Sequence, residues 1–241
     1  MTTTNHEERI LFQLNWFSEQ GDFAQLQTIL HTVYSTQYFS IKTLLNTVFR
    51  NATPLHRAIY KGHSNIVGFL LEKGANVDLA DANNVMPLFA AIKLNHNNSM
   101  DIMVALLEHK ANVNISGNRG LTPLCCACHY GYFKKVKLLL DSCADPKLPE
   151  ELGKNALHYA VFGQNLDILK LLINCVDVNS CDRNNVSPLM VACEMNFLPA
   201  HKHFEETLKA HDLRAKGVLQ FLVNNKANVN IQGGKNAYTA L

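Results

Sequence analysis

Hydrophobic positions between Thr53 and Asp78 recur at the spacing of two short helices joined by a turn. The first apolar stripe is Leu55, Ala58 and Ile59, and the second is Ile66, Val67, Leu70 and Leu71. Each predicted helix has only about ten residues, which is too short to be stable alone in water. The two helices must therefore bury their stripes against other helix pairs, so we expect further copies in the chain.

Residues that favour helix ends flank both stripes. Thr53 can accept a hydrogen bond from a free amide of the first turn, and Pro54 suits the first helical position because its φ is already set. Gly62 and Gly74 follow the two stripes and can take the left-handed conformation that ends a helix. The stretch therefore predicts one turn, two helices and a loop.

Edited copies of this stretch fill most of the chain. Its anchor, Thr-Pro-Leu-His, recurs as Met-Pro-Leu-Phe, Thr-Pro-Leu-Cys, Asn-Ala-Leu-His and Ser-Pro-Leu-Met. The anchor leucines lie 33, 36, 33 and 32 residues apart and are Leu55, Leu88, Leu124, Leu157 and Leu189. The closing motif, Gly-Ala-Asn-Val-Asp, recurs as Lys-Ala-Asn-Val-Asn at two later places.

This period and this anchor motif are the signature of ankyrin repeats, and from about Ile10 to Leu241 the chain resembles the ankyrin-repeat family. The resemblance implies an all-α solenoid of antiparallel helix pairs with β-turn finger loops. The repeat array is expected over residues 51–241, with repeats that start near residues 53, 86, 122, 155 and 187 and a sixth begun at residue 239.

Residues 1–50 are predicted as an N-terminal capping helix pair followed by an extra segment, because a stack of repeats needs a cover for its first core face. The two cap helices are expected at Ile10–Phe17 and Phe23–Leu30. Apolar residues between Val33 and Arg50 predict a short extra helix packed on the first repeat. The polar residues expected on the outer face of the cap are Glu7, Glu8, Gln13 and Glu19.

The fifth repeat departs most from the pattern, because its second helix starts late. Phe204, Leu208 and Ala215 lie at helical spacing between its two helices, which predicts a helical insertion over residues 197–217. A partner site built on this insertion is one alternative to a site on the repeats themselves.

Composition and charge narrow the function classes. Hydrophobic residues make up 47% and charged residues 17% of the 241 residues, as in folded rather than disordered proteins. The net charge is +2 without a run of basic residues, and the apolar runs are too short to span a bilayer. We therefore expect neither a nucleic-acid partner nor a membrane. The polar and acidic N-terminus shows no secretory signal peptide.

The seven cysteines are an odd number and lie within helical repeats, which favours reduced thiols and a cytoplasmic location. Asparagine pairs such as Asn83-Asn84 hint at an AT-rich coding genome, and a bacterial ankyrin effector in a host cytoplasm is one interpretation. In that case the chain is the targeting portion of a larger secreted effector or enzyme, with an active domain beyond residue 241.

Cys125-Cys126-Ala127-Cys128-His129 is the densest candidate for metal binding or nucleophilic catalysis. Alignment with the other repeats places Cys128 in the core, and only Cys126 and His129 are expected to point outward. Zinc ligands must converge at tetrahedral geometry, which side chains along one continuous helix cannot do. We therefore predict no metal, no cofactor, no small-molecule substrate and no enzyme activity.

His56 and His158 occupy the histidine position of the anchor motif. The family resemblance implies that this side chain hydrogen-bonds back to the turn and to the neighbouring repeat. We therefore expect both histidines to have a structural role and not a catalytic one.

In ankyrin arrays the finger loops and the outward side of the first helices line a concave groove, and the resemblance implies that a protein partner binds there. The partner-binding residues predicted in this way are Arg57, Tyr60, Lys61, Lys93, Arg119, His129, Tyr130, Tyr159, Phe162, Arg183, Glu194 and Met195. Three smaller residues are expected to point outward at equivalent positions: Ala90, Cys126 and Val191.

Large aromatics at positions that the core does not require are typical of interface hot spots, especially with Arg nearby. Tyr130, Tyr159 and Phe162 therefore form the central patch of the predicted site. The resemblance does not identify the partner protein, and we expect the chain itself to be a monomer.

Overall fold

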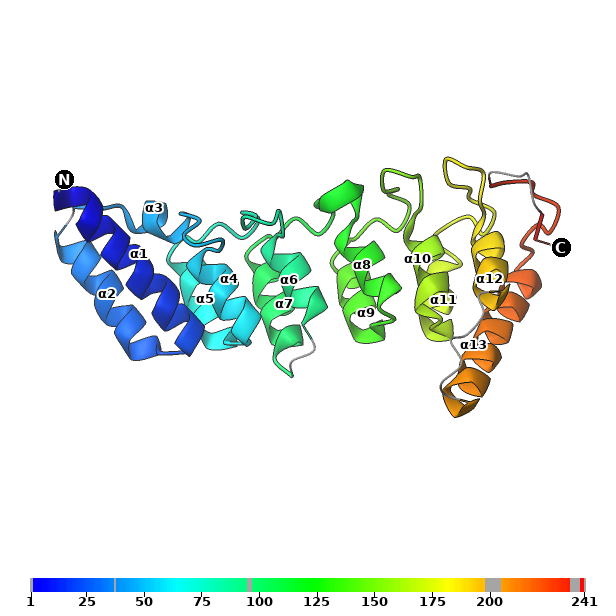
Figure 1. Ribbon diagram of the computed structural model, residues 1–241, viewed down its shortest axis with the longest axis horizontal. Helices are drawn as coiled ribbons and strands as arrows, with labels where there is room; N and C mark the ends of the chain where they lie inside the picture. The colour runs from blue at the N-terminus through cyan, green and yellow to red at the C-terminus, as the bar shows by residue number, and fades with distance from the viewer. Residues whose placement is uncertain (1, 37, 95–96, 198–204, 235–238, 241) are drawn as a thin grey trace. The chain divides into compact units, whose positions relative to one another are not determined.

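The computed structural model describes residues 2–36, 38–94, 97–197, 205–234 and 239–240, with side-chain detail confined within these ranges to residues 6–194 and 214–240. The chain forms two compact units, Met1–Asn118 and Arg119–Leu241 (Figure 1). The predicted division at residue 50 stays a prediction.

Helix pairs make up both units, and the described residues contain no strand beyond an isolated bridge between Phe49 and Ala52. The first unit contains α1 (Thr2–Gln20), α2 (Phe23–Thr36), α3 (Ile41–Leu45), α4 (Pro54–Lys61), α5 (Ser64–Glu72), α6 (Pro87–Lys93) and α7 (Ser99–Glu108). The second unit contains α8 (Pro123–His129), α9 (Phe133–Asp141), α10 (Ala156–Gly163), α11 (Leu166–Leu172), α12 (Pro188–Phe197) and α13 (Glu205–Asn224). A short 3₁₀ helix, η1, covers Asn118–Gly120.

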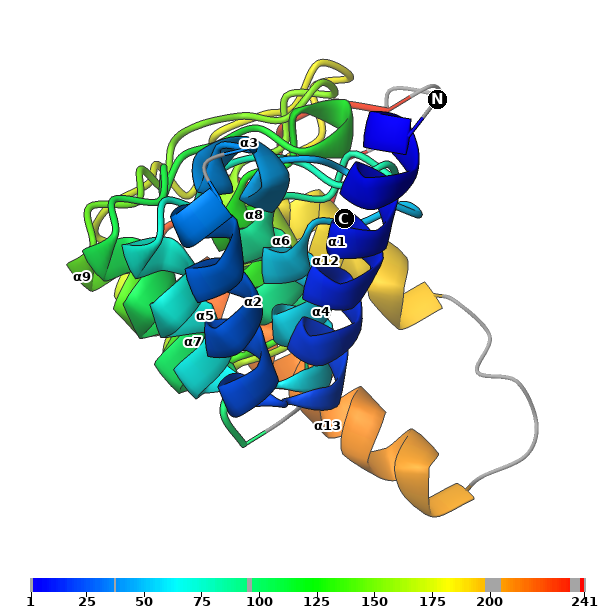
Figure 2. The same ribbon diagram turned by 90° about the vertical axis from the view of Figure 1, so that its left-hand side faces the viewer.

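Each unit has two layers of helices. In the first unit, α1 packs against α4 and α4 against α6, while α5 packs against α7 on the other side (Figure 2). In the second unit, α8 packs against α10 and α10 against α12, while α9 and α13 pack against α11. We call the layer of α1, α4 and α6, and separately that of α8, α10 and α12, the first-helix face of its unit.

The helix ends follow the predicted capping residues. The Thr53 side chain accepts a hydrogen bond from the backbone N–H of His56, and Pro54 is the first residue of α4. Gly62 ends α4 with a φ of 77°, a left-handed conformation that glycine adopts without steric penalty. Thr122 caps α8 in the same way, because its side chain accepts from the N–H of Cys125.

The anchor leucines form the centre of the core, and none of the five is more than 2% exposed. Leu14 of α1 is completely buried as well, and it precedes Leu55 by the same 41 residues that separate Gly21 from Gly62. The cap helix therefore uses the same core position as the repeats, although it lacks their anchor motif.

The finger loops share one backbone feature. The third residue before the first residue of α4, α6, α8, α10 and α12 has a positive φ in every case. The residues at this position are Asn51, Asn84, Gly120, Gly153 and Asn185. Glycine and asparagine tolerate this region better than other residues, which explains why the repeats place them there.

His56 links its own helix start to the next finger loop. Its Nε2 lies 2.9 Å from the carbonyl oxygen of Val85, and its Nδ1 lies 2.8 Å from Thr53 Oγ1. A carbonyl can only accept, so Nε2–H donates to Val85 and Nδ1 accepts from the Thr53 hydroxyl. His158 makes the corresponding bond to the Val186 carbonyl at 3.1 Å. The contacts to the turn and the neighbouring repeat that we expected for both histidines are present.

Two segments interrupt the regular repeats. The helix α3 lies in the extra segment, where Leu44 and Leu45 are buried. Asn46 fixes the loop after α5, because its Nδ2 donates to the Gly74 carbonyl and its Oδ1 accepts from the Asn76 N–H. In the second unit, α13 runs without a break from Glu205 to Asn224. The predicted insertion is thus helical from Glu205, and residues 198–204 lie outside the described part.

The cap helices are longer than predicted. Helix α1 begins at Thr2 and ends at Gln20, whereas the apolar stripe predicted only Ile10–Phe17. Likewise α2 continues to Thr36, beyond the predicted end at Leu30. An apolar stripe marks only the part of a helix that is buried, so it does not reveal polar turns at either end.

Burial lowers the pKa of His56 and of His158 below the usual value of 6.5, because the charged ring is poorly solvated there. The unfolded chain then binds more protons, so we expect the free energy of unfolding to fall between about pH 7.5 and about pH 5.5. The double variant His56→Asn/His158→Asn should be less stable at the higher pH and show a smaller decline. Urea unfolding at both pH values tests this, and an equal decline in both proteins would contradict it.

Candidate functional site

Four predicted site residues meet in one cluster in the second unit. The ring of His129, at the end of α8, lies 5.3 Å from that of Tyr130 and 6.1 Å from those of Tyr159 and Phe162 on α10, measured between centroids. The Lys154 Nζ lies 5.4 Å from the centre of the Phe162 ring. Edge-on aromatic pairs of this kind contribute about 0.5–1.5 kcal/mol each beyond their buried area. We call these four rings the aromatic cluster.

Close approach of α8 and α10 brings these rings together. A Cβ atom added to Gly163 would overlap the Cys128 carbonyl oxygen, which no real side chain tolerates. Gly131, just after α8, has a φ of 67°, and a Cβ atom added to it would lie 3.0 Å from the Gly163 carbonyl oxygen. Glycine at these two positions therefore lets the helix ends approach and sets the aromatic cluster at their junction.

Part of the aromatic cluster is open to solvent. The Tyr130 side chain is 48% exposed and His129 is exposed, while Tyr159 and Phe162 are half-buried. Burial, with Glu150 nearby, raises the pKa of Tyr159 to about 12, so its hydroxyl stays protonated at neutral pH. The cluster thus presents amphipathic rings with a lysine at its edge.

The other predicted residues of the second unit are distributed around this cluster. Arg119, Arg183 and Glu194 are exposed, and the Arg183 N–H donates to the carbonyl of Leu152 in the preceding finger. The side chain of Met195 lies outside the described residues.

Three residues expected to point outward are buried. Ala90, Cys126 and Val191 are at most 2% exposed, so this part of the prediction was wrong. Cys126 lies on α8, which α10 approaches closely at Gly163. At the same position Arg57 and Tyr159 remain half-buried, because only a long side chain extends beyond the neighbouring helix.

In the first unit, Arg57, Lys61 and Lys93 lie on α4 and α6 as predicted. Arg57 and Lys61 form ion pairs with Glu19 of α1, at 3.5 Å and 3.4 Å, so Glu19 faces α4 and not the outer side of the cap. Tyr60 donates to Asp81 Oδ2 at 2.7 Å. Burial and this bond raise the pKa of Tyr60, which therefore stays neutral.

The sequence prediction missed an aromatic and basic surface on α1. Phe12 and Trp16 are 40% and 50% exposed, and their rings stack at 6.1 Å with 17° between planes. The Arg50 guanidinium lies 5.2 Å from the Phe12 ring centre and 5.4 Å from that of Phe49. We call Phe12, Trp16, Phe49 and Arg50 the tryptophan patch. The 41-residue offset of the cap, which places Trp16 at the position of Arg57, is the signal that could have located it.

A cavity of about 180 Å³ adjoins the tryptophan patch. Asn15 and Arg57 also line it, and their Oδ1 and Nε atoms are the two buried side-chain atoms without a hydrogen-bond partner among the described residues. Arg57 Nη2 donates to the Arg50 carbonyl at 2.6 Å, which holds both arginines at the edge of the cavity.

The cysteine-rich stretch lies inside the repeat core. Cys125, Cys126 and Cys128 are at most 2% exposed. Burial raises the pKa of the Cys125 thiol to about 11 and that of Cys128 well above its usual value. Since the thiolate is the reactive form, these thiols are poor nucleophiles. In the part of the chain with described side chains, no three His, Cys, Asp or Glu residues are placed to hold a metal ion.

A family model described as ankyrin repeats, three copies, matches residues 5–81, 73–150 and 136–233. The chain belongs to the ankyrin-repeat family. Ankyrin-repeat domains are typically non-catalytic modules for protein interaction, and the helix pairs and finger loops of both units are those of this family.

Relatives in this family are much longer proteins. Human transient receptor potential cation channel subfamily A member 1 is 26% identical over 76% of this chain and 16% of its own length. Mouse Rabankyrin-5 is 34% identical over 59% of this chain and 12% of its own length. The chicken nuclear factor NF-kappa-B p105 subunit is 28% identical over 71% of this chain and 18% of its own length. The chain thus spans less than a fifth of each, and these comparisons give no support to a bacterial source.

The crystal structure of the ankyrin repeat domain of Bcl-3 is similar to this chain with a TM-score of 0.72 and 20% identity, over 95% of this chain and 91% of that domain. The predicted fold class, an all-α ankyrin-repeat solenoid, is confirmed by this likeness and by the family model. Among the described helices, none is both long and apolar enough to cross a membrane.

The seven cysteines should differ in their rate of alkylation according to their solvent exposure. We expect iodoacetamide to modify Cys143 and Cys175 first, because both are exposed, and to leave Cys125, Cys126 and Cys128 unmodified in the folded protein. Peptide mass spectrometry after brief labelling measures this, with urea-unfolded protein as the control in which all seven react. Early modification of Cys126 would show that α8 turns its side chain outward after all.

Proposed function

We propose that this chain is a non-catalytic scaffold that binds a partner protein on its first-helix face, together with the adjoining finger loops. The observation that carries this proposal is the exposure of large aromatic side chains there, Trp16 in the first unit and Tyr130 in the second. When a partner covers a large exposed aromatic side chain, much apolar surface leaves water, and this burial contributes strongly to the binding free energy.

The composition of the two surfaces supports a protein partner. Trp, Tyr and Arg are enriched among residues that dominate binding energy at protein interfaces. The tryptophan patch combines Trp16 with Arg50, and the aromatic cluster combines three rings with His129 and Lys154 at its edge. Arg57 and Lys61 continue the basic surface along α4, where Glu19 balances part of the charge.

A second proposal concerns the protein as a whole. The chain corresponds to less than a fifth of the length of each relative named above, which supports a role as the interaction portion of a larger cytoplasmic protein. Reading the native gene past codon 241 tests this, and an immediate stop codon would remove the proposal.

Loss of Tyr130 should weaken partner binding. We expect Tyr130→Ala to reduce the affinity for a partner first isolated by affinity capture and then purified, by at least about 2 kcal/mol or about thirtyfold. Val223→Ala is the matched control, because Val223 is 46% exposed on α13, outside the first-helix face. Calorimetric titration measures the affinity of both variants for the partner. An unchanged affinity of Tyr130→Ala would show that the aromatic cluster is not part of the interface.

Trp16 provides a direct reporter for the first unit, because it is the only tryptophan in the chain. With fluorinated tryptophan incorporated, the protein should give one fluorine NMR signal, which we expect to shift when the partner covers this half-exposed ring. An unlabelled partner of any composition can be used. A signal that stays in place at saturating partner would show that the tryptophan patch is not part of the interface.

A further inference from the structure

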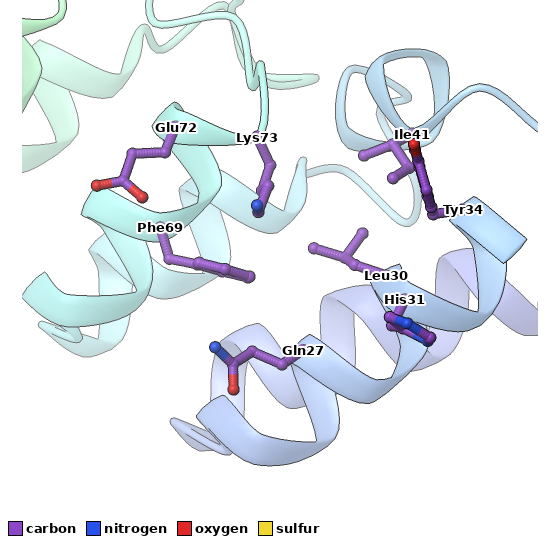
Figure 3. Close-up of a pocket in the computed structure, with 8 residues that line it drawn as sticks. All are labelled: Gln27, Leu30, His31, Tyr34, Ile41, Phe69, Glu72 and Lys73. Atoms are coloured by element: carbon purple, nitrogen blue, oxygen red, sulfur yellow. The ribbon is translucent and has the colours of Figure 1, made fainter.

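A hollow of about 620 Å³ opens on the opposite layer of the first unit, between α2 and α5 (Figure 3). Its lining residues come from three helices and are Gln27, Leu30, His31, Tyr34, Ile41, Phe69, Glu72 and Lys73. The four from α2 follow the spacing i, i+3, i+4 and i+7, so they form one continuous helix face. This face of α2 is therefore only partly covered by the protein itself.

The extra segment shapes this hollow. Phe23 meets Phe69 edge-on at 5.0 Å, which joins α2 to α5, and Ile41 of α3 adds a further wall. The helix α3 is held in place by buried Leu44 and Leu45 and by the hydrogen bonds of Asn46 to the loop after α5. The hollow is thus built from packed and hydrogen-bonded elements, as preformed binding pockets are.

The walls are apolar and the edge is basic. Leu30 is nearly fully buried, while Tyr34 is 74% exposed and leaves one side open. Figure 3 shows the Lys73 side chain directed toward the hollow and the Glu72 carboxylate directed away from it. The Lys73 Nζ lies 5.4 Å from the centre of the Phe69 ring.

A second exposed lysine, Lys42 of α3, lies near Gly74. A Cβ atom added to Gly74, the residue after Lys73, would lie 3.8 Å from Lys42 Cγ. Neither lysine has an ion-pair partner among the residues with described side chains. The exposed ammonium group of Lys73 beside an apolar hollow complements a group that is apolar in the middle and anionic at its edge.

We propose that this hollow binds a segment of a partner protein that inserts a large apolar side chain between Tyr34 and Phe69 and places a carboxylate side chain against Lys73. A protein segment fits better than a free lipid, because Tyr34 leaves the hollow open to water and a broad partner surface would cover it. The site lies on the second helices and requires neither the tryptophan patch nor the aromatic cluster, so it goes beyond the proposed function.

A peptide-display selection on the immobilised protein tests the proposal, followed by fluorescence anisotropy with the enriched peptides. The enriched sequences should carry an aromatic or aliphatic anchor flanked by Asp or Glu. We expect Tyr34→Ala and Lys73→Glu each to weaken their binding by about tenfold or more, and added salt to weaken it further. Tyr38→Ala and Lys110→Glu are matched controls, because both residues are exposed and neither lines the hollow.

The outcomes also separate this site from the first-helix face. Trp16→Ala and Tyr130→Ala should leave the affinity for these peptides unchanged, and a loss there instead would assign the peptides to the first-helix face. The proposal is overturned if no peptide depends on Tyr34 and Lys73, or if basic peptides are enriched. Binding of dodecanoate without any such peptide would make the hollow a fatty-acid site, and self-association abolished by Tyr34→Ala would make it a dimer contact.

Discussion

The main constraint on this protein is that its helices are too short to be stable in isolation. Helix α4 has eight residues and α6, α8 and α11 have seven, well below the length at which an isolated helix is stable in water. Each first helix persists because its anchor leucine is buried, and α11 persists because Ile168, Leu169 and Leu172 are buried. The hydrogen bonds of His56 and His158 join the start of each helix to the next finger loop, while the buried leucines hold the apolar faces of the helices together. Stability therefore depends on neighbouring repeats.

The same constraint decides which side chains can serve recognition. Helices α8 and α10 approach closely at Gly163, and Cys126 of α8, which was expected on the surface, is buried. A long side chain at that position, such as Tyr159, still reaches past the neighbouring helix. The surface available for binding is thus formed by side chains long enough to extend past the neighbouring helix. This explains why large aromatic and basic residues are found there.

Most of the repeat framework could be predicted from the sequence, because leucine period, capping residues and glycine stops are local signals. Thr53 and Gly62 have the conformations that the pattern indicated, and the two buried histidines have the partners that the family resemblance implied. The burial of Cys126 could not be predicted, since it depends on the distance between two helices. The tryptophan patch was missed because α1 lacks the anchor motif, and because Glu19 was assigned to solvent instead of to Arg57.

Departures from the repeat produce the features that distinguish this chain from a plain array of helix pairs. The segment between α2 and α4 supplies Ile41 to the hollow on one layer and Phe49 and Arg50 to the tryptophan patch on the other. In a regular repeat every residue has a structural role, because each position either packs on a neighbour or forms a turn. Extra residues are free of that requirement, and once α3 is fixed by Leu44, Leu45 and Asn46 they form rigid walls. Regularity thus stabilises the stack, while irregularity determines what each face can bind.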